Sequence, residues 1–125
     1  KAIFAMTGEY LQVREQFAVK IGTFQALQHR AAKCFIELEL AQSTVISALS
    51  KADSDADDFA ASVSLAKWKL GKVADLISGE AVQMHGGIGV TDELDVGLYL
   101  KRIRVAQMSL GDVDFHHARY AQLTA

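Results

Sequence analysis

The sequence predicts an all-α fold, an up-down antiparallel helical bundle, on three observations. Its 125 residues include no proline, although an average usage near ~5% would give about six, and long unbroken helices explain that absence most simply. Apolar residues recur at intervals of three and four along most of the chain, which is the period of an amphipathic helix. No segment of useful length alternates apolar and polar residues, so strands are not expected. Long helices joined by short connections favour antiparallel neighbours.

The first two helices are predicted over residues 3–17 and 24–50. The first has apolar residues at 3–4 spacing, namely Ile3, Met6, Tyr10, Val13 and Phe17. Gly22 interrupts the pattern after it. The second stripe keeps step for about seven turns. Its members are Phe24, Leu27, Ala31, Cys34, Leu38, Ala41, Val45 and Leu49.

A third helix is predicted from the acidic segment 54–58 to the glycines at 86–87. Ser54 is a suitable N-cap, Asp57 follows three residues later, and acidic residues in a first turn complement the helix dipole. The apolar face consists of Phe59, Val63, Ala66, Leu70, Val73, Ile77, Ala81 and Met84.

A fourth helix is predicted to begin at residues 91–93. Its apolar side would consist of Val96, Tyr99, Leu100, Ile103 and Leu110. Gly111 interrupts this pattern, and Asp112 is expected to cap a short last helix that carries Phe115 and Ala118. No repeat or linker divides the chain, so residues 1–125 are predicted to form a single domain.

Composition excludes several classes of function. The net charge of −2 and the absence of a basic segment argue against nucleic-acid binding. No apolar run approaches the ~18 residues of a membrane span, and residues 1–4 lack the features of a signal peptide. The single cysteine excludes an internal disulfide and fits a reducing compartment, so we expect a cytoplasmic protein, or a mitochondrial matrix protein in a eukaryote. Half of the residues are hydrophobic, a surplus that predicts an obligate interface.

Histidine and cysteine give no chemical site. Cys34 lies on the apolar face of the second predicted helix and is expected to be a packed thiol. His116 and His117 are adjacent, and neighbours on a helix do not share a face. We therefore expect no metal site.

Three other features each have a structural and a functional interpretation. Arg14 could be a solvated residue that favours the helix dipole, or its planar fork could bind a phosphate. Gln25 could be a surface residue or could recognise a nucleotide. The glycine-rich residues 86–89, preceded by Gln83, could end a helix with a positive φ, or could let backbone N–H groups approach an anion.

Three motifs, weak singly, occur in a specific order. They are Tyr10-x3-Arg14-x2-Phe17, Phe24-Gln25-x2-Gln28 and Ala81-Val82-Gln83-x2-Gly86-Gly87-x-Gly89. Together they resemble the C-terminal helical domain of the acyl-CoA dehydrogenases, and the resemblance covers nearly the whole chain.

The resemblance implies an FAD-dependent enzyme. Members of that family oxidise acyl-CoA to 2,3-enoyl-CoA, and they consist of an N-terminal helical domain, a middle β domain and this C-terminal bundle, which forms the core of a tetramer. The chain would thus be part of a longer protein, would assemble as a homo-oligomer or with a paralogous subunit, and would be inactive by itself because the acyl-CoA-binding walls belong to the other domains.

The resemblance also implies the cofactor-binding residues. Arg14 matches the arginine that contacts the FAD pyrophosphate of a neighbouring subunit, and Phe17 matches the aromatic residue that packs nearby. Gln25 matches the glutamine at the adenosine part of FAD. Gln83, Gly86 and Gly87 match the turn that holds the adenine and ribose end.

The chain departs from the family at the catalytic base. Leu110 occupies the position of the usual glutamate and cannot accept a proton. Asp112 replaces the threonine that contacts the flavin. Three explanations remain open: a base on the helix leading into Tyr10, a non-catalytic subunit of a two-chain dehydrogenase, or a base at Asp112 or Asp114 after a local shift of register.

Overall fold

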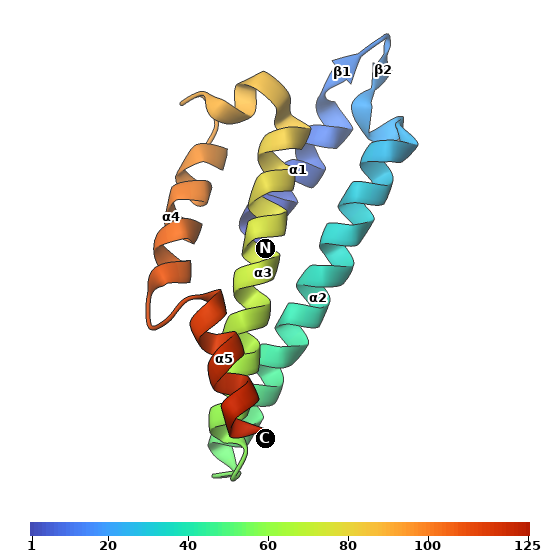
Figure 1. The fold of residues 1–125 in the computed structure, drawn as a ribbon. Coiled ribbons are helices and arrows are strands. Elements are labelled where there is room, and N and C mark those ends of the chain that lie inside the picture. Colours follow the sequence, from blue (N-terminus) through green and yellow to red (C-terminus); the bar gives the residue numbers. More distant parts are fainter.

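The computed structural model describes residues 1–125 and consists of helices apart from one very short hairpin. The helices are α1 (Ala2–Val13), α2 (Gln25–Asp53), α3 (Phe59–His85), α4 (Val96–Met108) and α5 (Val113–Leu123). Figure 1 shows α2 and α3 running antiparallel as the two long elements, with α1, α4 and α5 arranged around α3. The predicted all-α bundle is therefore confirmed.

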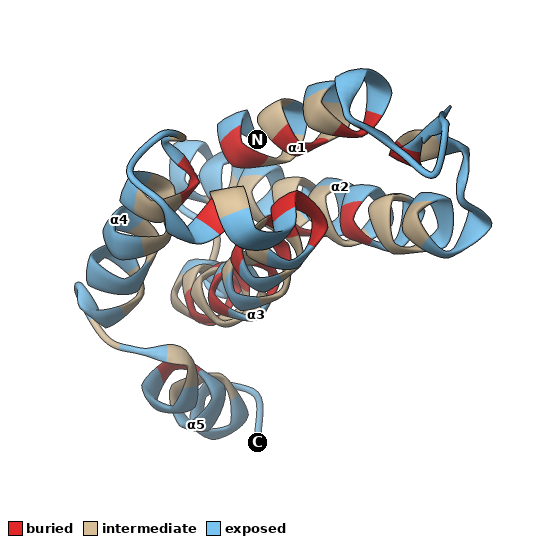
Figure 2. Cartoon of the chain, turned by 90° about the horizontal axis from the view of Figure 1, so that it is seen from above, coloured by how far each residue is buried: buried red, intermediate tan, exposed pale blue.

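The core lies along α3, which contacts α1, α2, α4 and α5. Buried residues concentrate on α3 and on the faces that the other helices turn toward it (Figure 2). Ten of them form one apolar cluster: Ile3, Leu11, Ile21, Cys34, Ala41, Val73, Ile77, Ala81, Met84 and Val96. Cys34 is the packed thiol that the sequence predicted, and its burial, together with the nearby Glu80 charge, raises its pKa.

The end of the first helix differs from the prediction. Helix α1 stops at Val13, and the chain then forms an antiparallel hairpin in which β1 (Glu15–Gln16) pairs with β2 (Val19–Lys20). Phe17 and Ala18 both have positive φ, at 54° and 61°, as a two-residue hairpin turn requires. Phe17 therefore leaves the helix, and the expectation of no strand was wrong at this turn. The buried face of α1 is Ile3, Thr7 and Leu11, so Val13 and Phe17 are exposed.

Two predicted helix starts are also wrong. The hydroxyl of Ser54 donates to Ser50 O (3.1 Å), so it serves the end of α2, and α3 begins only at Phe59. After α3, residues Gly86–Val90 form a 3-10 helix, η2. The hydroxyl of Thr91 donates to Ile88 O (2.8 Å) in the turn that follows, and α4 starts at Val96. In both cases the hydroxyl bonds to a carbonyl of the preceding turn and therefore does not cap the helix that follows.

The structure of the last helix agrees better with the prediction. Asp112 caps α5 as predicted, because its Oδ1 accepts a hydrogen bond from Phe115 N (2.8 Å). Leu110, however, does not belong to the apolar side of α4: it follows the helix, has a φ of 61° and is 91% exposed. None of the helices combines the length and the apolarity needed to cross a membrane.

Candidate functional site

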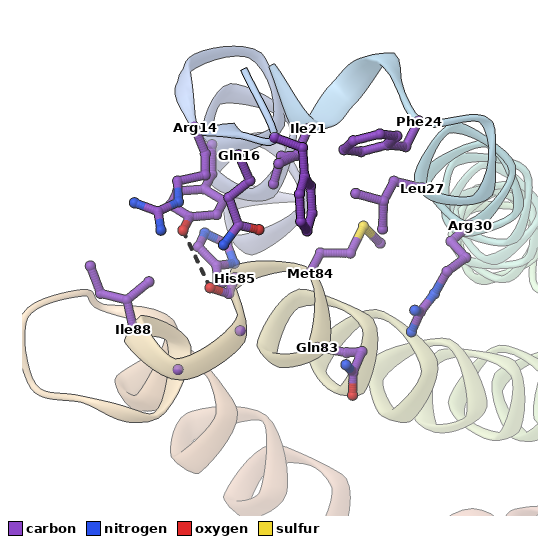
Figure 3. A pocket seen from close by; sticks show the side chains of 14 residues that line it. Arg14, Gln16, Ile21, Phe24, Leu27, Arg30, Gln83, Met84, His85 and Ile88 are labelled. Atoms are coloured by element: carbon purple, nitrogen blue, oxygen red, sulfur yellow. Dashed lines mark hydrogen bonds between the residues drawn. The ribbon is translucent and has the colours of Figure 1, made fainter. Parts of the chain in front are cut away.

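An open cavity of 510 Å³ lies at the hairpin end of the bundle. The end of α1, the hairpin, the first turns of α2, the end of α3 and η2 meet around it, as Figures 1 and 3 show. Five residues that the sequence predicted for the cofactor site line this cavity, namely Arg14, Phe17, Gln83, Gly86 and Gly87. Residues more than 60 positions apart in the chain are thus brought to one surface.

Gln25 is the predicted site residue that lies outside this cavity. It is the first residue of α2 and is exposed. Its neighbour Phe24 lines the cavity instead. Gln28, from the same motif, has a structural contact, because its Nε2 donates to Gly22 O (2.9 Å) and ties the start of α2 to the preceding turn.

Arg14 presents a free cation to the cavity. It directly follows α1, where its backbone N–H donates to Tyr10 O (2.9 Å) and its carbonyl accepts from Ile21 N (2.9 Å). Helix α1 therefore holds the backbone N–H of Arg14, and the residue after the hairpin holds its carbonyl. No carboxylate of the chain lies within ion-pairing distance of its guanidinium. A fixed backbone with an unpaired planar fork is suited to bind an anion with two oxygens, such as a diphosphate.

Gly86 ends α3 in a conformation that favours glycine, with φ 65° and ψ −143°. Its N–H is used within the chain, since it donates to carbonyls of the last turn of α3, at Gln83 and Val82. The structural interpretation of the glycine motif, a helix end with a positive φ, is thus confirmed. An added Cβ at Gly86 or Gly87 would meet no atom within 4 Å, so this edge of the cavity is open.

Tyr10 and His85, neither of which the sequence predicted for the site, build the wall behind these glycines. Tyr10 Oη donates to His85 O (3.3 Å), and the two rings stack with centroids 4.4 Å apart. The His85 side chain is buried, and its Nδ1 donates to Ala81 O (2.7 Å). Its Nε2 is buried without a partner, which leaves an unused acceptor in the wall. The sequence contained one indication of this wall, because His85 lies inside the glycine motif.

Arg30 is a further cavity residue that the sequence analysis missed. It projects from α2, and its Nε donates to Glu80 Oε2 of α3 (2.5 Å). Figure 3 shows Arg30 and Gln83 on one side of the cavity and Arg14 on the other. No motif marked Arg30, because its role depends on the packing of α2 against α3.

Leu110, at the predicted position of the catalytic base, follows the C-terminal end of α4, whereas η2 precedes its N-terminal end. The carbonyl of Leu110 accepts from His116 Nε2 (2.9 Å), while the Leu110 side chain is exposed. Asp112 is engaged in capping α5. No cluster of three or more histidine, cysteine or carboxylate side chains is arranged to hold a metal ion.

The domain is thus a helical bundle with a polar cavity at one end, and glycines form one edge of that cavity. The family model described as "Acyl-CoA dehydrogenase, C-terminal domain" matches residues 1–122. The chain belongs to this family.

Three known proteins illustrate the similarity. The chain is 37% identical over 106 residues to acyl-CoA dehydrogenase IpdE2 of Mycolicibacterium smegmatis, which is 85% of this chain and 32% of that protein. The ChsE4-ChsE5 complex from Mycobacterium tuberculosis contains a chain with a TM-score of 0.90 and 27% identity, over 96% of this chain and 32% of that one. The FAD complex of PigA gives a TM-score of 0.89 and 25% identity, over 96% of this chain and 31% of that one. The chain thus spans about a third of each of these proteins.

Proposed function

We propose that this chain is the C-terminal domain of an acyl-CoA dehydrogenase-like flavoprotein, with an N-terminal helical domain and a middle β domain preceding it. In the assembled protein the domain would contribute to the oligomer core and would bind the nucleotide part of a neighbouring subunit's FAD. The observation that carries this proposal is the cavity that unites Arg14, Phe17, Gln83, Gly86 and Gly87 and leaves the Arg14 guanidinium unpaired.

The residues of the cavity fit such a ligand. Arg14 would bind the diphosphate, and the exposed Phe17 ring would pack beside it. The open edge at Gly86 and Gly87 would admit the adenine and ribose, with the Gln83 amide as donor and acceptor. Gln25, outside the cavity, would contact the adenosine part from the first turn of α2. The bound FAD would supply the flavin that accepts the hydride.

The whole protein would oxidise acyl-CoA to 2,3-enoyl-CoA, and the bacterial relative supports a cytoplasmic site for this reaction. The 125-residue chain by itself would not catalyse it, because Leu110 supplies no base and the acyl-binding walls belong to other domains. Dehydrogenase activity measured on this chain alone would contradict that part of the proposal.

An Arg14→Ala substitution in the full-length flavoprotein tests the cofactor role. Losing a charge-assisted contact costs roughly 1.5–3 kcal/mol, so we expect FAD to bind roughly 10- to 100-fold more weakly. The measurement is the flavin absorbance retained after purification and the Kd for FAD in reconstitution of the apoprotein. Arg102→Ala is the matched control, because Arg102 is exposed on α4 and lies outside the cavity.

Unchanged FAD affinity in Arg14→Ala would show that the diphosphate role of Arg14 is wrong. A full-length protein that binds no flavin, either alone or with a partner chain, would overturn the FAD proposal as a whole.

The second candidate is a subunit of a two-chain dehydrogenase that binds part of the FAD but supplies no base. Two observations favour it: Leu110 is exposed at the position of the base, and Asp112 is engaged as a helix cap. The similarity to a chain of the ChsE4-ChsE5 complex adds support. Activity that appears only after reconstitution with a paralogous chain would favour this candidate. Activity of the homo-oligomer would exclude the two-chain candidate and would favour a base on the helix leading into Tyr10.

A further inference from the structure

The cavity contains a second arginine, Arg30, whose surroundings differ from those of Arg14. Arg30 projects from α2 and forms a half-buried ion pair with Glu80 of α3, in which Nε donates to Oε2 at 2.5 Å. Arg14 has no such partner and is exposed. One guanidinium at the cavity is therefore held in place with its charge balanced, and the other is free with its charge uncompensated.

Glu80 uses only one of the five N–H donors of Arg30. The hydrogen bond to Glu80 is made by Nε, and neither Nη nitrogen donates to another group of the chain. Since Glu80 does not line the cavity and Arg30 does, the carboxylate holds the guanidinium from behind. Figure 3 shows its free end directed toward the side on which Gln83 lies. Because the side chain is already ordered, little rotamer entropy remains to be lost when a ligand accepts hydrogen bonds from it.

The charge balance indicates what this end of the cavity would recognise. The Arg30–Glu80 pair is neutral as a whole, and a carboxylate close behind the guanidinium would weaken its attraction for a phosphate. A neutral acceptor, such as a purine ring nitrogen or a ribose hydroxyl, suffers no such opposition. The Gln83 amide lines the same side and is itself neutral. The Arg14 side of the cavity is therefore suited to bind an anion. The Arg30 side is suited to donate hydrogen bonds to neutral acceptor atoms of a ligand.

We propose that Arg30, held by Glu80, is a specificity-determining contact for the purine and ribose end of the nucleotide. Glu80 is the positioning residue of this pair and does not touch the ligand. The inference rests on the proposed function, because it identifies which part of the FAD faces this side of the cavity.

The experiment measures the Kd for FAD in the apoprotein of the full-length flavoprotein, at low and at high salt. Arg30→Met retains the apolar stem and removes the donors, and we expect FAD to bind roughly 5- to 10-fold more weakly. The salt dependence of the Kd is measured in the Arg30→Met/Glu80→Gln double variant, which removes the ion pair without changing the net charge. We expect this salt dependence to stay as in the unmodified protein, because Arg30 contacts a neutral part of the ligand. Arg14→Ala, in contrast, should reduce the salt dependence, because it removes a contact with the diphosphate.

A double-mutant cycle tests the positioning role of Glu80. Glu80→Gln should weaken FAD binding roughly two- to threefold in the presence of Arg30 and should not weaken it further in the Arg30→Met background, where there is no guanidinium to position. Arg104→Met is the control, since it breaks the Arg104–Asp75 ion pair between α4 and α3 outside the cavity and should leave the Kd unchanged. Should Arg30→Met fail to fold, Arg30→Lys retains the ion pair without the fork and is expected to lose FAD affinity similarly.

The outcomes separate this inference from the proposed function. If Arg14→Ala weakens FAD binding and Arg30→Met does not, the role of Arg30 is wrong while the cofactor site stands. A fall in salt dependence in the charge-matched Arg30→Met/Glu80→Gln double variant would mean that Arg30 contacts a phosphate, which also overturns the inference. If the unmodified protein binds no FAD, the proposed function itself fails.

Discussion

Gly86 determines both where α3 ends and how open the cavity is at its edge. Its φ of 65° and ψ of −143° lie in a region that residues with a Cβ rarely adopt. An added Cβ there would touch no atom within 4 Å. The cost of replacing this glycine is therefore conformational and contains no packing term.

Gly86→Ala is expected to lower the free energy of unfolding by about 1–3 kcal/mol because of this backbone strain. The measurement is urea denaturation followed by circular dichroism. Gly79→Ala is the matched control: Gly79 lies inside α3 and also has free space for a Cβ, but its φ is not positive. Alanine there should stabilise the chain by about 0.5–1 kcal/mol. Equal effects of the two substitutions would contradict the conformational explanation.

Leu110 shows how little a residue's identity reveals about its position. Its apolar side chain suggested the buried side of a helix, yet it is 91% exposed with a φ of 61°. A hydrogen bond holds the turn in place, because the buried His116 donates from Nε2 to the Leu110 carbonyl at 2.9 Å. A bulky residue in this region of φ is strained, and the hydrogen bond from His116 is one of the contacts that keep it there.

At the scale of elements, α5 is attached to α3 by a close approach and a polar network. Arg119 Nη1 donates to Ser64 Oγ (2.6 Å) and to Ala60 O (3.0 Å), and His116 Nδ1 lies 3.4 Å from the same hydroxyl. Near the start of α5, Val113 packs directly on Gly71 of α3. A Cβ on Gly71 would lie 2.3 Å from Val113 Cγ2, so the two helices approach as closely as a glycine allows.

Gly71→Ala should therefore destabilise the chain by about 1–3 kcal/mol, since the overpacking outweighs the better helix propensity of alanine. Urea denaturation gives the change in the free energy of unfolding. In a Val113→Ala background the clashing methyl group is absent, and the same substitution should cost less or become favourable. Additive effects of the two substitutions would show that this contact does not limit the approach of α5.

The helices were predictable to different degrees. The long periodic stripes located α2 and α3 correctly, because an amphipathic helix needs only local propensity and one apolar face. The connections were not predictable in the same way. Phe17 and Ala18 adopt positive φ although neither residue favours it, and Ser54 and Thr91 bond to preceding carbonyls instead of capping the next helix. At Ser54 and Thr91, bonds to the preceding turn outweigh a weak preference for capping the next helix.

At the scale of the whole molecule, a large part of the apolar surface of α2 is not covered. The exposed large apolar residues of this helix are Phe35, Ile36, Leu40, Ile46 and Leu49. Apolar residues gathered on one element of a surface are typical of an interface. This surface accounts for the hydrophobic surplus of the composition and supports the proposal that the domain contributes to an oligomer core.

Ile46→Glu tests this proposal, because Ile46 is 57% exposed in the C-terminal half of α2 and a buried charge in an interface is costly. We expect the full-length protein to dissociate to smaller species in light scattering coupled to size exclusion, with unchanged helical content. Gln122→Glu, which adds the same charge on an exposed position of α5, should leave the oligomer intact. An oligomer that resists Ile46→Glu would exclude this part of α2 from the interface.

The sequence by itself determined the all-α class, the two long helices, the buried Cys34, the end of α3 at Gly86 and the family. These properties depend on local periodicity, on the special backbone freedom of glycine and on the order of three motifs. Only the tertiary structure decided that Arg14 has no partner, that Arg30 is held by Glu80, and that His85 and Tyr10 stack behind the glycines. The physical reason is that a free or a balanced charge is defined by what lies next to it in space, and these neighbours come from helices far apart in the chain.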